Sequence, residues 1–309
     1  GDLRQAVDLH RQTLADRERI LDPDHPDILS SRHGLAHSLH DLGDLRQAVD
    51  LHRQTLADRE RILDPDHPDI LSSRNNLANA LHDLGDLRQV ADLHRQTLSD
   101  SERVLGPDHP DTLTSRSNLA VVLNDLGDLG QAVDLYRQNL ADRERILGPD
   151  HPHTLTTGSN LATALHDLGE HQQAVDLHRQ VLADRERILG PDHPNTLTTR
   201  HNLATALNHL GEHQQAVDLH RQVLADRERT LGPEHPDTLS SRNNLATALH
   251  DLGEHQQAVD LHHRNLADRE RILGPDHPNT LTTRHNLAIA QAQLAEVERR
   301  WWWQRLRRG

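Results

Sequence analysis

Histidines, asparagines and carboxylates are the residues of this sequence whose types and spacing could do chemistry. The 309 residues include 27 His, and four of these directly precede an aspartate: His40, His82, His166 and His250. A His–Asp pair can bind a metal ion or orient a catalytic base. However, adjacent residues on a helix point about 100° apart, and no third ligand recurs at a zinc-like spacing. The pattern therefore predicts no metal site.

Many of the other histidines fall into two rows. One row lies between prolines in a linker, where we expect a structural role: His25, His67, His109, His151, His193, His235 and His277. The second row recurs within a helical stretch, with Tyr136 taking its place once: His10, His52, His94, His178, His220 and His262. Tyr and His share a flat ring with a polar edge, so we expect a half-buried ring with a hydrogen-bonded tip.

No catalytic set is present. The chain has no Cys, no Gly-rich phosphate loop, no Gly-x-Ser-x-Gly and no His-Glu-x-x-His. Charge runs such as Asp58 to Arg61 are typical of a solvated helix face. The net charge of −14 argues against nucleic acid as a partner. No apolar run approaches the ~18 residues of a membrane span, so we expect a cytoplasmic protein. Because no catalytic set is present, we also expect that the protein is not an enzyme and needs no cofactor.

The elements that carry these residues follow from a 42-residue repeat. Glycines open each unit at Gly1, Gly43, Gly85, Gly127, Gly169, Gly211 and Gly253. Seven units cover residues 1–294, and residues 295–309 form a tail rich in Trp and Arg. A fixed period of this length indicates units that cannot bury their apolar faces alone and must stack. The sequence predicts an all-α fold.

Each unit contains two helices. Pro26 opens an apolar periodic stretch that ends at Leu42, and Gly43 follows directly. Proline at the first helical position and glycine beyond the last turn are the expected ends of a helix. A second helix is predicted from about Asp44 to Leu63, with the Asp44 carboxylate as its N-cap.

These motifs resemble the tetratricopeptide repeat (TPR). The resemblance rests on Asn-Leu-Ala at residues 76–78, on Leu84-Gly85, and on Ala174 five residues after Gly169. The unit length and the Leu-Gly-Pro-Asp-His-Pro linker are similar to the kinesin-light-chain subgroup, which also occurs in bacterial proteins. The resemblance covers nearly the whole chain and implies a right-handed superhelical solenoid of antiparallel helix pairs. The sequence departs from the resemblance at Arg32, Leu39 and His52, which stand where the family usually has larger aromatic side chains.

The first helix of each unit has a constant and a variable part. Leu35 and its six equivalents never change, which indicates the stacking core. The residue two positions before that Leu varies, as does the residue two positions after it. The resemblance implies that this variable face lines a concave groove for a peptide. Its candidate binding residues are Asn75, His201, Asn243, His285 and Asn79, together with an asparagine ladder formed by Asn76, Asn118, Asn160, Asn202, Asn244 and Asn286.

Two interpretations of the asparagine ladder stay open. Asparagine is unfavourable in a helix interior by several tenths of a kcal/mol, because its amide competes for backbone groups, so six copies indicate a compensating role. The amides either grip the backbone of an extended peptide or bond to the neighbouring repeat and set the stacking register.

The tail breaks the repeat. The glycine that ends the first helix of other units is replaced by Ala295, and Glu296 to Arg308 contains no Pro or Gly. We therefore expect one long final helix, over which Trp301, Trp302 and Trp303 fan out. This segment is interpreted as a cap on the last layer, a self-association element that enters a neighbour's acidic groove, or, less favoured, a membrane-surface contact.

The sequence as a whole predicts a protein-interaction scaffold with an unidentified protein or peptide ligand. The alternative is the sensor region of a larger signal-transducing ATPase, since bacterial repeats of this subgroup often follow a nucleotide-binding domain. The chain opens on the second helix of a unit, so we expect that it continues a longer protein. The gene sequence upstream of Gly1 would distinguish the two, because a Walker A motif there supports the sensor.

Overall fold

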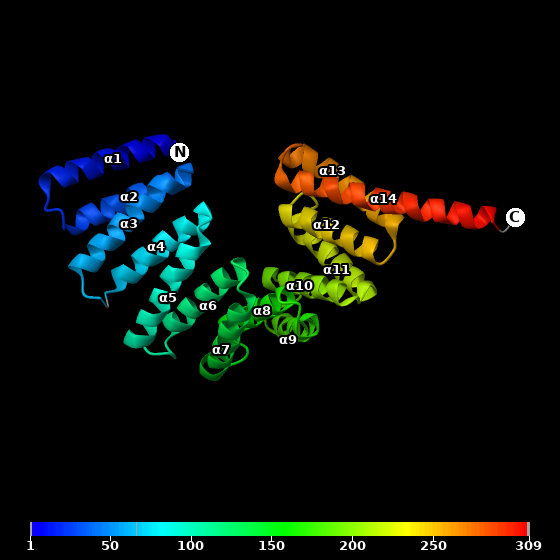
Figure 1. Cartoon of the computed structure of the whole chain (residues 1–309), viewed down its shortest axis with the longest axis horizontal. Helices are drawn as coiled ribbons and strands as arrows, with labels where there is room; N and C mark the ends of the chain where they lie inside the picture. Colours follow the sequence, from blue (N-terminus) through cyan, green and yellow to red (C-terminus); the bar gives the residue numbers. More distant parts are fainter. Residues whose placement is uncertain (1, 66, 308–309) are drawn as a thin grey trace. The chain divides into compact units, whose positions relative to one another are not determined.

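The computed structural model describes residues 2–65 and 67–307, and within these ranges every regular element is an α-helix (Figure 1). Two kinds of helix alternate, as predicted. Helices A begin at a linker proline: α2 (Pro26–Leu42), α4 (Pro68–Leu84), α6 (Pro110–Asp125), α8 (Pro152–Asp167), α10 (Pro194–Leu210), α12 (Pro236–Asp251) and α14 (Pro278–Leu306). Helices B follow the glycine: α1 (Leu3–Ile20), α3 (Leu45–Ile62), α5 (Leu87–Val104), α7 (Leu129–Leu147), α9 (His171–Leu189), α11 (His213–Leu231) and α13 (His255–Leu273).

The helix ends follow from the residues at them. In α2 the N-cap is His25, Pro26 takes the first helical position, and Gly43 ends the helix at a φ of 87°. That left-handed conformation is one that only glycine adopts readily. Asp44 caps α3 by accepting a hydrogen bond from the Gln47 amide at 3.4 Å. The predicted bounds of both helices and the predicted cap are confirmed to within a residue.

Small apolar side chains make up the core between consecutive helices. Leu35, Ala36 and Val49 are 5%, 0% and 2% exposed. Full burial of one leucine contributes about 1.5–3 kcal/mol. Because these side chains are short, each layer is thin and is completed only by the next helix of the stack.

A row of arginines replaces aromatic packing on helices A. Arg116 is 1% exposed, and its guanidinium lies 2.7 Å from Asp142 and 3.1 Å from Glu102. A buried charge is tolerated only when it is paired, so this arginine links α6 to the helices B on either side of it. Equivalent pairs are made by Arg32, Arg74, Arg200 and Arg242.

The charge run from Asp58 to Arg61 is only partly the solvated face that the sequence indicates, since Glu60 and Arg61 are exposed whereas Asp58 and Arg59 are half-buried. The Arg59 side chain is only 15% exposed, and it donates to the Asp69 carbonyl and the Ser73 hydroxyl. Asp58 accepts from Arg32 at 2.6 Å. The prediction was wrong for Asp58 and Arg59, because their side chains contact α2 and α4, whose positions the sequence does not reveal.

The helices form two compact units, residues 1–146 and 147–309. In unit 2 each helix packs against the helices before and after it, and the helices A also contact one another in the order α8, α10, α12, α14. Unit 1 has the same alternation from α1 onward. Successive helices A of unit 2 therefore lie side by side, and in unit 1 the 2.6 Å contact between His40 and Asp83 joins α2 to α4.

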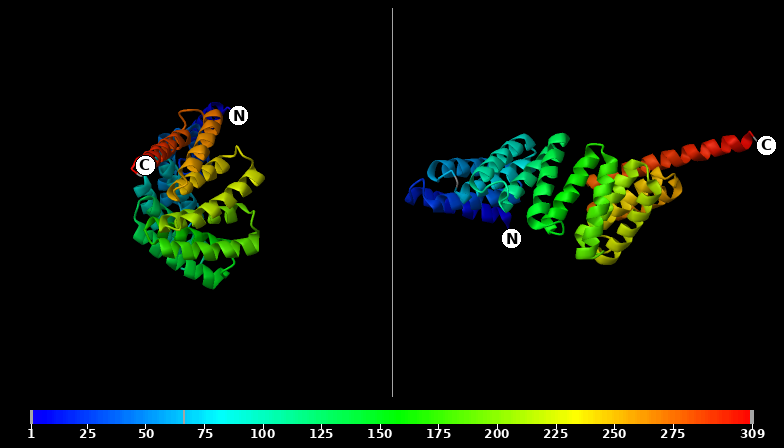
Figure 2. Two further views of the ribbon diagram at one scale, coloured as in Figure 1. Left: turned by 90° about the vertical axis from the view of Figure 1, so that its right-hand side faces the viewer. Right: turned by 90° about the horizontal axis from the view of Figure 1, so that it is seen from below.

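The final helix runs on as predicted. Leu294 of α14 still packs against the cluster of Val259, Leu287 and Ala290. Beyond it, Trp302 and Trp303 are 61% and 65% exposed. Figure 2 shows this end of α14 projecting past α13. The side chain of Trp301 lies outside the described residues. The division between repeats and tail at residue 295 stays a prediction, since α14 passes through it without a break.

Candidate peptide-binding pockets on helices A

One variable position of helix A is apolar in only two repeats. Most repeats carry His, Asn or Thr two residues after the constant leucine, but α6 carries Val121 and α14 carries Ile289. These two side chains are 39% and 47% exposed. Each forms one wall of a pocket between two helices A and the helix B that separates them.

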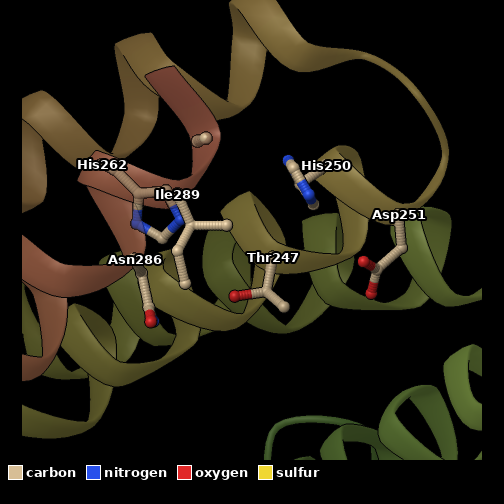
Figure 3. Close-up of a pocket in the computed structure, with 7 residues that line it drawn as sticks. Thr247, His250, Asp251, His262, Asn286 and Ile289 are labelled. Atoms are coloured by element: carbon tan, nitrogen blue, oxygen red, sulfur yellow. The ribbon is translucent and has the colours of Figure 1, made fainter. Parts of the chain in front are cut away.

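The unit 2 pocket has a volume of about 290 Å³. Figure 3 shows Asn286 and Ile289 from α14 facing Thr247 from α12, with the His262 ring of α13 beside Ile289. His250 and Asp251 stand at its rim, on the last turn of α12. An aliphatic wall, an amide and a carboxylate thus surround a space the size of one large side chain.

The unit 1 pocket repeats this arrangement four units earlier. It has a volume of about 460 Å³ and is lined by Asn75, Ala78, Asn79, His82, Val90, His94, Asn118, Val121 and Val122. Asn118, Val121 and His94 correspond in the repeat to Asn286, Ile289 and His262. The two pockets therefore form at equivalent positions of the two repeats in which the variable residue is apolar.

The helix B histidines are more deeply buried than the sequence indicates. His178, His220 and His262 are only 1–2% exposed, and the Nδ1 atoms of all three lack a hydrogen-bond partner within the described part of the chain. Burial lowers the pKa of His262 to about 4 and that of His220 to about 3. The prediction of a half-buried ring with a bonded tip was wrong for these three, because the adjacent helices A cover the ring completely. His262 lines the unit 2 pocket with this covered ring.

Part of the asparagine ladder bonds to the preceding helix A. Asn244 Nδ2 lies 3.0 Å from a His201 ring nitrogen, and Asn286 Nδ2 donates to Asn243 Oδ1 at 3.4 Å. Asn76 makes the equivalent contact to His33 at 3.5 Å. These bonds fit the interpretation that the amides set the stacking register. Each Asn side chain still has a second N–H and a carbonyl oxygen, so the two interpretations are compatible.

The structure places the other predicted residues on helices A of the two units. Asn75 and Asn79 are exposed at the unit 1 pocket, and His285 is exposed on α14. His201 is half-buried, and its ring centroid lies 5.3 Å from that of His220. The half-buried ladder members Asn160 and Asn202 occupy equivalent positions on α8 and α10.

The sequence-based prediction missed the residues that turn this face into pockets. These are the apolar walls Val121 and Ile289. A signal was present, since Val121 and Ile289 are the two apolar exceptions in a polar row.

The linker histidines have the structural role that was expected. In all seven linkers the Nδ1 atom accepts a hydrogen bond, 3.2 Å long, from the amide two residues later, which caps helix A. Of the His–Asp pairs, His40 reaches across to Asp83 of the next helix A at 2.6 Å, and His166 lies against His209, with 4.6 Å between ring centroids. In the described ranges no group of three His, Asp or Glu is arranged to hold a metal ion.

Comparisons with known proteins agree with this geometry. The tetratricopeptide repeat family matches the overlapping residue ranges 1–61, 33–100, 92–141, 111–187, 159–229, 201–264 and 237–298. The chain belongs to the tetratricopeptide repeat family. No curated protein matches it. Among the described helices of this TPR protein, none is long and apolar enough to cross a bilayer.

Several solved structures resemble this TPR protein. A putative kinesin light chain with nearly identical TPR-like repeats, from Podosopora anserina, is 33% identical, with a TM-score of 0.61 over 67% of this chain and 98% of that one. BtubC from P. vanneervenii is 20% identical, with a TM-score of 0.60 over 76% and 94%. A Rap protein complexed with competence and sporulation factor is 12% identical, with a TM-score of 0.50 over 95% and 87%. The kinesin-light-chain resemblance is therefore confirmed, and the last two share the fold.

Proposed function

We propose that this TPR protein is a non-catalytic scaffold whose helix A faces bind a peptide segment of a partner protein. The TPR fold is typical of protein-interaction scaffolds, and the solved Rap protein is bound to competence and sporulation factor. The observation that carries the proposal for this chain is the pair of equivalent pockets, one in each unit.

Each pocket offers three kinds of contact. The exposed Ile289 or Val121 side chain packs against an apolar group of the ligand. The free hydrogen-bonding capacity of Asn286 or Asn118 serves the ligand's backbone amide and carbonyl groups. In unit 2, Asp251 at the rim favours a basic neighbouring residue. The expected ligand is a peptide that presents one large apolar residue next to Arg or Lys.

The test begins with selection of binding peptides from a phage-displayed random library, followed by affinity measurement with a labelled synthetic peptide. Ile289→Arg fills and charges the unit 2 pocket, and Val121→Arg does the same in unit 1. We expect the double variant to bind at least about tenfold more weakly, or ~1.4 kcal/mol. Leu9→Arg is the matched control, because Leu9 is 65% exposed on α1 and far along the chain from either pocket. It should bind like the parent.

A third variant separates the two interpretations of the ladder. Asn118, Asn160 and Asn202 are changed together to Ala, and folding is compared by circular dichroism. Weaker peptide binding at unchanged stability indicates that the amides grip the ligand, whereas a lower melting temperature at unchanged affinity indicates a register role.

Equal peptide affinity in the parent and in the double arginine variant would reject the pockets as the binding site.

A further inference from the structure

The projecting end of α14 carries a basic aromatic stripe. Arg300, Trp303, Gln304 and Arg307 recur at helical spacing and line one shallow recess on the helix surface. Trp303 is 65% exposed between the two arginines. An exposed indole between two guanidinium groups forms an apolar and basic patch on a chain whose net charge is −14. A patch of this kind is typical of an interaction site.

The unit 2 pocket is complementary to this stripe. Its volume, about 290 Å³, suits one large ring, and Ile289 supplies an aliphatic wall. Asp251 at the rim accepts only from the neutral Asn208 amide, at 2.6 Å, among the described residues, so its charge is available to a guanidinium.

We propose that the α14 stripe of one chain docks into the unit 2 pocket of a second copy, with Trp303 in the pocket and Arg300 or Arg307 against Asp251. This proposal rests on the function proposed above and names the occupant of one pocket. Gln304 lies on the same face and contacts the rim.

The same chain cannot fill its own unit 2 pocket. Ala290 of α14 lines this pocket, and Trp303 lies about 13 residues farther along the same unbroken helix, roughly 20 Å away. No Pro or Gly interrupts the helix after Pro278, so it does not fold back. The stripe is therefore available to another copy.

A second copy is favoured over a lipid surface. Trp and Arg also suit the membrane interface, but the acidic chain as a whole is repelled by anionic lipids. Because stripe and pocket are different surfaces, the contact is heterologous, and association continues beyond a dimer unless a ring closes.

Sedimentation velocity of the full chain over a concentration series tests the association. We expect the parent to associate reversibly and less strongly in high salt, since the arginine–carboxylate contact lies at the exposed rim. Trp303→Ala should weaken association at least about tenfold. Trp302→Ala is the matched control, because Trp302 has nearly the same exposure, 61%, but points about 100° away around the helix. It should change the dissociation constant less than about twofold.

A mixing experiment assigns the two partners of the contact. Ile289→Arg blocks the pocket and keeps the stripe, whereas Trp303→Ala keeps the pocket and loses the stripe. Each variant should remain monomeric alone, and the two should form a 1:1 complex when mixed. Circular dichroism confirms that both are folded. A parent that stays monomeric at all concentrations, or the absence of a mixed complex, would overturn the proposal.

Tryptophan fluorescence gives a readout of the stripe itself, because the three Trp of the chain all lie in the tail. Docking should shift the parent's emission to shorter wavelength as its concentration rises. A shift seen only with phosphatidylglycerol vesicles, in a monomeric parent, would overturn the proposal in favour of a lipid surface. If the selected phage peptide still binds the pocket in that case, only the occupant is wrong. If it does not, the proposed function fails as well.

Discussion

The linker histidines and the helix B histidines are one residue type in two environments. In the linker, His193 is half exposed to solvent, and its Nδ1 accepts from the Asn195 amide at 3.2 Å. In helix B, His220 is 2% exposed, and its Nδ1 has no partner in the described ranges. The linker uses the polar nitrogen, whereas helix B uses the flat ring. Similar frequency of a residue at two positions of the repeat therefore says little about which of its properties each position uses.

Acid should give the largest loss of folding stability, through the buried helix B histidines. Burial lowers the pKa of His52, His178 and His262 to about 4, and that of His220 to about 3. In the unfolded chain such rings take up protons near pH 6.5. The unfolded state thus binds more protons below that pH, and the stability that is fully present above pH 6.5 falls as the pH approaches 4. We expect a loss of about 2 kcal/mol per buried ring at about pH 5, measured by urea unfolding.

The control for this prediction is His178→Tyr, chosen because Tyr136 occupies the equivalent position of α7 and is 3% exposed there. The variant should show a shallower dependence of stability on pH than the parent. Equal unfolding free energies of the parent near neutral pH and near pH 5 would contradict the burial of neutral rings.

Substitution of a single helix B histidine should give the next largest effect. His220→Asp places a carboxylate at a fully buried position beside the His201 ring and should cost about 3–5 kcal/mol. His220→Tyr keeps a ring with a polar edge and should cost less than about 1.5 kcal/mol. Chemical denaturation of both variants checks the difference. If Asp is tolerated as well as Tyr, water reaches this position and the ring is not part of the core.

At the linker position an aspartate should be tolerated, in contrast to helix B. Substitutions there should change the free energy of unfolding least. His193→Ala removes the cap of α10 and should cost about 1 kcal/mol. His193→Asp restores an acceptor at the helix N-terminus and should be at least as stable as the parent. Urea unfolding at neutral pH makes the comparison. A loss in the Asp variant equal to that in the Ala variant would show that the ring, and not the hydrogen bond, matters in the linker.

The helices could be predicted closely because proline and glycine set their ends locally. The bounds of α2 and α3 and the Asp44 cap depend on residues adjacent in sequence. The burial of Arg59 and the His220 ring could not be predicted, because it depends on which neighbouring helix covers them. The pockets could be predicted only in part. The sequence shows that the variable position two residues after the constant leucine is polar in most repeats. Its two apolar exceptions become pocket walls only when helices A lie side by side.

The stacking described above has a consequence for the gene. Helices within a unit pack on their immediate neighbours, and α1 and α3 have the same sequence over all 18 residues. A recombination event that duplicates or removes one whole repeat therefore leaves every remaining interface with a compatible partner. Such a chain can lengthen or shorten across generations without redesign of a core. Only the rare residues that break the repeat, Val121, Ile289 and the tail tryptophans, would change their spacing.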